Sequence, residues 1–235
     1  MILSLFSVYA QAARYANVAN NPSYNFSSVG TFSGYYETSA DGGFIRAENS
    51  TLNINPANAT FSNNSAHAGG VFYFTNSKAF FSGTNLYFFY NSASFGGVIG
   101  GVAPTGGAIY ATNNSSIVFR TNNIEFRGNI ASQDGPAAFA RDGAYIGFEA
   151  ANGKVLMDGH SGGFGGAIYT WTGTIDFYGS GLVATISNNS AVNEGGVMDV
   201  TRGGGGIKFR NGTVNLNDNY AGGSGSENGG GAISI

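Results

Sequence analysis

The residues that could perform chemistry are few in this chain of 235 residues. Asp134, Asp142, Asp158 and His160 form its one local concentration of acids with a base. Carboxylates near a base could cleave a glycosidic bond by acid–base catalysis, and clustered carboxylates could hold Ca²⁺. A catalytic patch is one interpretation. The other is that His160 replaces Asn in a structural repeat while the acids are solvated.

The residues needed for disulfides, thiolate metal sites, calcium-binding repeats or phosphate loops are missing from the sequence. The chain has no Cys, so it uses neither disulfides nor thiolate metal sites. Its Gly-rich segments lack the Asp of calcium-binding nonapeptide repeats and the Lys-Ser of phosphate loops. We therefore expect no metal and no cofactor. A net charge of −3 without a run of Lys or Arg argues against nucleic acid, and no apolar run is long enough for a membrane helix.

Two short motifs alternate along the chain and define a repeat. The first is a Gly pair followed by a small and an apolar residue, as in Gly106–Ile109. The second is an apolar residue, two spacers and Asn, as in Phe88–Asn91. Successive Gly pairs lie 27 residues apart (42, 69, 96) or 30 apart (165, 195). Three short runs of alternating apolar and polar residues separate these anchors, which is the period of half-buried strands.

This pattern, with no helical periodicity, predicts an all-β, right-handed parallel β-helix with three short strands per coil and about seven coils. Equivalent side chains of successive coils should stack in files. The expected structural Asn file, whose amides would satisfy the corners, is Asn64, Asn91, Asn129, His160, Asn189 and Asn219. The expected structural Phe file is Phe81, Phe119, Phe148, Phe177 and Phe209. Polar or charged residues lie between or after these Phe positions at Arg120, Glu149, Asp176, Lys208 and Arg210.

The repeat also indicates the domain organisation. Residues 42–235 should form the β-helix repeats, with insertions near 96–105 and 222–228. Residues 1–41 lack a clean Asn anchor and are predicted to be an irregular N-terminal strand, a cap or a partial first coil, with an atypical signal peptide at 1–12 as the alternative. Because the sequence stops within a first strand, we expect a piece of a longer protein whose solenoid continues at the C-terminal end.

The paired motifs resemble the repeats of the chlamydial polymorphic outer membrane proteins. This resemblance implies an autotransporter-type surface protein, in which a β-helical passenger precedes a membrane barrel, and adhesion to host cells. It extends roughly from residue 42 to residue 235. The best-matching segments are Phe88–Asn91, Phe126–Asn129, Gly106–Ile109 and Gly165–Ile168.

We therefore expect a non-enzymatic, extracellular or cell-surface module, associated with the outer membrane if bacterial. It would act like the passenger domain of an adhesin, presenting a lateral surface to a host-cell or surface receptor or glycan. Tyr73, Tyr110 and Tyr169 follow Gly pairs and are predicted to be exposed on that surface. Two alternatives stay open: a polysaccharide lyase or hydrolase on a pectin-lyase-like β-helix, and a structural spacer of a surface coat.

Overall fold

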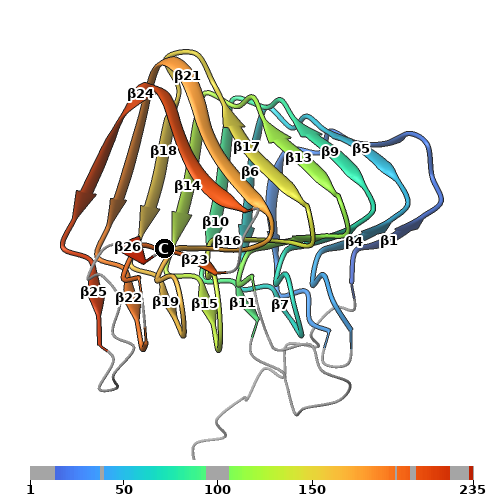
Figure 1. Cartoon of the computed structure of the whole chain (residues 1–235). Coiled ribbons are helices and arrows are strands. Elements are labelled where there is room, and N and C mark those ends of the chain that lie inside the picture. Colours follow the sequence, from blue (N-terminus) through green and yellow to red (C-terminus); the bar gives the residue numbers. More distant parts are fainter. Residues whose placement is uncertain are drawn as a thin grey trace, which may run out of the picture.

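The computed structural model describes residues 14–37, 40–93, 106–193, 195–201, 205–222 and 233–234. Within these ranges the chain is all-β, with strands β1 to β26 and no helix. Corresponding strands of successive coils pair in parallel, and they stack into ladders that run the length of the molecule (Figure 1). The predicted parallel β-helix is therefore confirmed.

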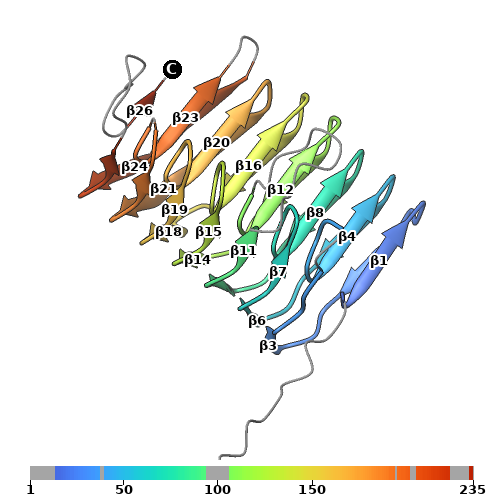
Figure 2. The same cartoon turned by 90° about the horizontal axis from the view of Figure 1, so that it is seen from below.

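The first strand of every coil belongs to one eight-stranded sheet, seen side by side in chain order in Figure 2. Its inward residues are apolar, and a Gly with positive φ precedes most of its strands. The strands are β1 (Ala16–Ala19), β4 (Ile45–Glu48), β8 (Phe72–Thr75), β12 (Ile109–Thr112), β16 (Ala138–Arg141), β20 (Ile168–Trp171), β23 (Met198–Thr201) and β26 (Ile233–Ser234).

The middle and third strands of the coils form two further ladders. The middle strands are β2 (Tyr24–Phe26), β5 (Thr51–Ile54), β9 (Lys78–Phe81), β13 (Ser116–Phe119) and β17 (Tyr145–Glu149). The third strands are β3 (Gly30–Ser33), β6 (Asn58–Ser62), β10 (Asn85–Phe89), β14 (Asn123–Arg127) and β18 (Lys154–Asp158). In the last two coils both strands join into β21 (Thr174–Ser187) and β24 (Gly206–Asn217), so the two ladders count as one twelve-stranded sheet.

A short fourth strand, absent from the sequence prediction, follows the Asn corner. These two-residue strands form a six-stranded sheet, so six coils are complete in the described part of the chain, close to the seven or so predicted. They are β7 (Ser65–Ala66), β11 (Ser92–Ala93), β15 (Ile130–Ala131), β19 (Ser161–Gly162), β22 (Ser190–Ala191) and β25 (Tyr220–Ala221).

The N-terminal coil is built from β1, β2 and β3, and an isolated bridge from Tyr36 to Ser65 stands where later coils have the short strand. Residues 1–12, the possible signal peptide, and residues 96–105, the predicted insertion, lie outside the described residues. Residues 223–228 of the insertion predicted near 222–228 lie outside them too.

Aromatic rings fill the interior in columns. In the predicted Phe file, Phe81 and Phe119 stack with ring centroids 4.3 Å apart, and the contacts continue at 5.2, 4.9 and 5.0 Å through Phe148 and Phe177 to Phe209. A second column runs along the third strands through residues 61, 88 and 126. Each aromatic pair contributes about 0.5–1.5 kcal/mol beyond the area it buries.

The Asn corner is held by hydrogen bonds between coils. The Oδ1 of Asn91 accepts the backbone N–H of Asn64 at 3.0 Å, and the Asn91 amide donates to the carbonyl of Phe61 at 2.9 Å. Asn91 in turn donates its own backbone N–H to Oδ1 of Asn129 at 2.9 Å. The residue before each file position has a positive φ, as Tyr90 does, which turns the corner sharply. The file thus satisfies backbone groups that the corner would otherwise leave buried and unpaired.

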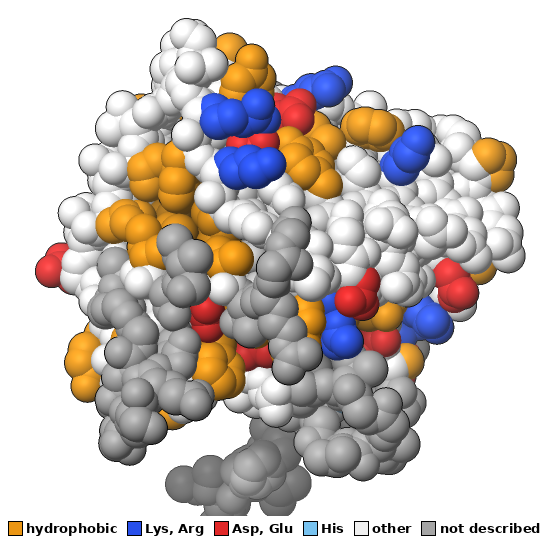
Figure 3. Space-filling view, viewed as in Figure 1, with side chains coloured by type: hydrophobic (Ala, Val, Ile, Leu, Met, Phe, Trp, Pro, Cys, Tyr) orange, Lys and Arg blue, Asp and Glu red, His pale blue; other side chains and the backbone are white. Residues whose placement is uncertain are grey.

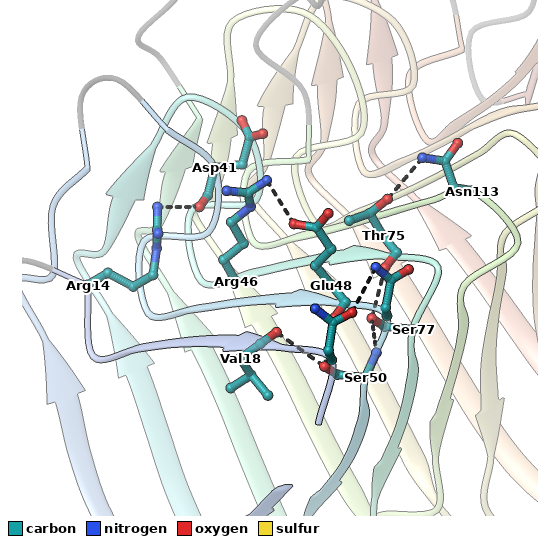
Figure 4. Close-up of polar contacts among 11 residues, drawn as sticks. Arg14, Val18, Asp41, Arg46, Glu48, Ser50, Thr75, Ser77 and Asn113 are labelled. Atoms are coloured by element: carbon teal, nitrogen blue, oxygen red, sulfur yellow. Dashed lines mark hydrogen bonds and ion pairs between the residues drawn. The ribbon is translucent and has the colours of Figure 1, made fainter. Parts of the chain in front are cut away.

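A second internal file, of Ser, lies at the corner after the first strand (Figure 4). The backbone N–H of Ser50 donates to Oγ of Ser77 at 3.1 Å, and that of Ser77 donates to Oγ of Ser115 at 3.1 Å. The Ser50 hydroxyl donates to the carbonyl of Glu48 at 2.7 Å. The sequence signal for this file is the Asn-Ser pair that follows the first strands β4, β8 and β12, at residues 49–50, 76–77 and 114–115.

Replacing Asn91 by Ala should destabilise the fold by about 3 kcal/mol, because it leaves the buried Asn64 N–H without its acceptor and removes the donor to Phe61. Asn85 is the matched control, since its amide donates to Asn58 in an exposed ladder. Asn85→Ala should cost less than about 0.5 kcal/mol. Urea unfolding of both variants measures the difference, and equal costs would refute the internal role of the file.

Candidate functional site

The three predicted binding tyrosines share one column on the outer face of the first-strand sheet. Tyr73 and Tyr110 stack at 5.1 Å, and Phe139 packs at 5.1 Å on Tyr110 and at 4.9 Å on Tyr169. The prediction that they are exposed is wrong for two of them, because Tyr110 is 2% and Tyr169 is 3% exposed. The reason is that the rings bury one another and Ala68 packs against them, forming a second small core.

Tyr73, at the end of this column, is half-buried. Burial raises its pKa, and the nearby Asp41 carboxylate raises it further. The Arg46 guanidinium lies over the Tyr73 ring at 5.9 Å and pairs with Glu48 at 3.4 Å (Figure 4). These contacts occupy the ring, so we do not place a binding surface on the tyrosine column.

The predicted acidic cluster does not converge on one site. Asp142 pairs with Arg141 at 3.1 Å, at the corner after β16. Asp158 lies at another corner, where it pairs with Arg127 at 3.0 Å and accepts a hydrogen bond from Asn188. No group of three or more His, Asp or Glu side chains in the described ranges could hold a metal ion. The proximity of these acids in sequence is not proximity in space, because successive corners point in different directions.

Asp134 has a different surrounding from the other acids. It is buried, and burial followed by repulsion from Asp199 raises its pKa to about 7. Asp199 belongs to β23, in the same outer column as Tyr169. The two acids therefore lie at the end of the buried aromatic column and not in an open groove.

His160 occupies its predicted place in the Asn file. Its Nδ1 accepts the backbone N–H of Asn129 at 3.0 Å, and its own backbone N–H donates to Oδ1 of Asn189 at 3.0 Å. Its Nε2 is buried without a hydrogen-bond partner, and burial lowers its pKa to about 3. A neutral, enclosed imidazole has a structural role here, since no substrate atom could reach it.

An exposed row of mixed side chains crosses the outer face of the middle ladder. Strand register aligns Glu149 with Tyr178 and Tyr178 with Arg210, and Arg120 pairs with Glu149 at 3.4 Å. A shallow groove of about 330 Å³ runs beside this row, and Figure 3 shows Lys and Arg gathered with acidic and hydrophobic side chains over this region. The groove is lined by Arg120, Glu149, Ala151, Tyr178, Gly179 and Ser180. We call Arg120, Glu149, Tyr178 and Arg210 the outer row.

A buried acid supports the outer row from beneath. Asp176 is 2% exposed, and its Oδ1 accepts from Nε of Arg210 at 3.1 Å. The hydroxyl of Tyr145 lies 3.4 Å from Asp176 and 3.2 Å from Glu149, so its single proton serves one carboxylate at a time. Burial, and then the charges of these two acids, raise the Tyr145 pKa and keep the phenol protonated. The ring lies over Gly147, where a Cβ would come within 2.7 Å of it.

Some residues of the outer row could be identified from the sequence. Arg120, Glu149 and Arg210 were expected among the polar positions beside the Phe file, which places them on the outer face. Tyr145 and Tyr178 were missed as site residues. The only feature of the sequence that could have identified them is their position in the repeat, because both occupy outward positions of middle strands.

Replacing His160 by Asn should stabilise the fold and weaken its acid sensitivity. The folded pKa is near 3 whereas the unfolded chain titrates at about 6.5, so the unfolded state binds more protons between these values. The free energy of unfolding therefore falls as the pH drops below about 6.5, by up to about 1.4 kcal/mol per pH unit. Urea unfolding at pH 7 and pH 5 should give a smaller difference for His160→Asn than for the wild type. Equal differences would show that the imidazole is not enclosed.

No match to this chain was found among protein-family models, curated proteins or solved structures.

Proposed function

We propose that this chain is a non-enzymatic, adhesin-like module of a cell surface or of the extracellular space, and that it binds a surface glycan through the outer row and its groove. The observation that carries the proposal is an exposed aromatic ring flanked by cations and a carboxylate on a rigid ladder. The Asn, Ser and Phe files inside the coils have structural roles, so they leave the exterior free for binding. No helix in the described ranges is long and apolar enough to cross a membrane.

Tyr178 is the centre of the proposed glycan site. It is 41% exposed, and the Arg210 guanidinium lies 4.6 Å from its ring centroid, which holds the ring in place. The apolar face of a sugar can pack against such a ring, while a few placed polar groups fix its orientation. Glu149 on the adjoining strand β17, and Arg120 one ladder step further along, supply an acceptor and donors for sugar hydroxyls.

The backbone beneath the outer row is rigid before any ligand arrives. β17 pairs with β13 on one side and with β21 on the other, and β21 pairs with β24. Side chains on such strands lose little further freedom on binding, which favours affinity from a small contact area.

Replacing Tyr178 by Ala should weaken glycan or cell binding by about tenfold, the equivalent of about 1.4 kcal/mol from one lost aromatic contact. Tyr220→Ala is the control, because Tyr220 is also an exposed tyrosine but lies on the short-strand sheet. Binding to immobilised glycans and to host cells, with thermal melting as a check of folding, measures the effect. If both variants bind like the wild type, the outer row is not the binding face.

The structure also favours a second candidate function, a polysaccharide-cleaving enzyme. Its specific support is the Tyr145 hydroxyl between the carboxylates of Glu149 and Asp176, which could place an acid and a base on one face.

Under our proposal, the wild type releases no new reducing ends or unsaturated products from any glycan that it binds. The assay is prolonged incubation with the bound glycan, followed by product analysis. Accumulating product that Glu149→Gln abolishes would favour the enzyme over the adhesin.

A further inference from the structure

We propose that the outer row selects acidic sugars, carrying a carboxylate or a sulfate, within an oligosaccharide longer than one ring. This inference rests on the proposed glycan-binding function and names the class of glycan. It follows from how charge is distributed across the outer face of the middle ladder.

The two acids of this face are already engaged. Asp176 is buried and accepts from Arg210, so it offers solvent almost no charge. The Glu149 side chain is largely covered and pairs with Arg120, and the Tyr145 hydroxyl lies within hydrogen-bond distance of both acids and donates to one of them at a time. The two carboxylates therefore mainly orient the arginine side chains and contribute little repulsion to an anionic ligand.

The cations of the same face are turned toward solvent. The side chains of Arg120 and Arg210 are 64% and 52% exposed. Lys208 is exposed beside Asp176 in the strand register, and no described acidic side chain forms an ion pair with it. A chain with an overall charge of −3 thus presents a local positive surface around an exposed tyrosine, which is complementary to an anionic ligand.

The spacing of the cations sets the size of the ligand. Arg120 directly follows β13, and Arg210 lies on β24, three ladder steps away, which is about 14 Å at ~4.8 Å per step. One sugar ring cannot reach both, whereas an oligosaccharide lying across the strands could contact Arg120, pass over Tyr178 and reach Arg210. Arginine matches the planar geometry of a carboxylate or sulfate through paired N–H donors.

The test is calorimetric titration of the whole chain with four probes: an oligo-uronate, its methyl ester of equal length, a dextran and a dextran sulfate. The oligo-uronate or the dextran sulfate should bind more tightly than its neutral counterpart, and the tighter of the two distinguishes a carboxylate ligand from a sulfate one. Binding should weaken when the salt rises from 0.1 to 1 M, as the screening length falls from about 10 to about 3 Å. The uronate monosaccharide should bind far more weakly than the oligomer.

Two single variants locate the effect. Arg120→Gln and Lys208→Gln should each weaken binding of the acidic oligomer by about fivefold, the effect of one exposed charge contact. Lys78→Gln is the matched control, because Lys78 is an exposed lysine on the same outer face but its strand, β9, lies four ladder steps from β24. Arg210 is not replaced, since its loss would leave the buried Asp176 carboxylate without its cationic partner.

The outcomes separate this inference from the function beneath it. Equal affinity for the uronate and its methyl ester, and for the two dextrans, with Tyr178→Ala still weakening binding, would overturn acidic selectivity and keep the glycan site. An equal loss with Lys78→Gln would mean non-specific attraction to charge and would overturn the inference. Absence of binding to every glycan, including arrays of other sugars, would overturn the proposed function itself.

Discussion

The structure depends on one repeated hydrogen bond, from a corner N–H of one coil to a side-chain acceptor of the next. Each corner turns on a residue with positive φ, such as Tyr90, and buries the backbone that follows it. Without the Oδ1 of Asn129, the Asn91 N–H would be buried without a hydrogen-bond partner, at a cost of about 1–3 kcal/mol. The same bond recurs from corner to corner, and the third strands that lead into these corners stay in parallel register from coil to coil.

The constant register of the strands has consequences on both faces of the ladders. Inward, it places Phe81 over Phe119 and so on along the core. Outward, the same register aligns Glu149, Tyr178 and Arg210 on adjacent strands. The strand pairing of the solenoid by itself positions such a row of surface residues. Residues about one repeat apart in sequence become neighbours at the spacing of paired strands. Function on such a molecule can change by outward substitutions that leave the interior files untouched.

The sequence was informative where periodicity decides the structure and uninformative where packing does. The recurring Gly pairs and the single Asn residues between them were sufficient to predict the parallel coils and the positions of the Asn file and the Phe file. Alternation tells which side of a strand a residue faces, but it does not tell what packs over that side, so the burial of Tyr110 was not foreseeable. Likewise the contact of Tyr145 with Asp176 depends on the missing side chain of Gly147, a relation that becomes visible only in three dimensions.

His160 shows which part of the repeated bond is indispensable. Its Nδ1 reproduces the acceptor that Asn Oδ1 supplies elsewhere, whereas its Nε2 finds no carbonyl in the way that the Asn189 amide does. The acceptor is therefore required by the corner, and the donor only strengthens it. The coil with this weaker corner is also the coil that carries Tyr145 and Glu149. Proteins commonly depart from their structural rules near functional sites. The replacement of Asn by His160 in the file is therefore consistent with a site on the outside of the same coil.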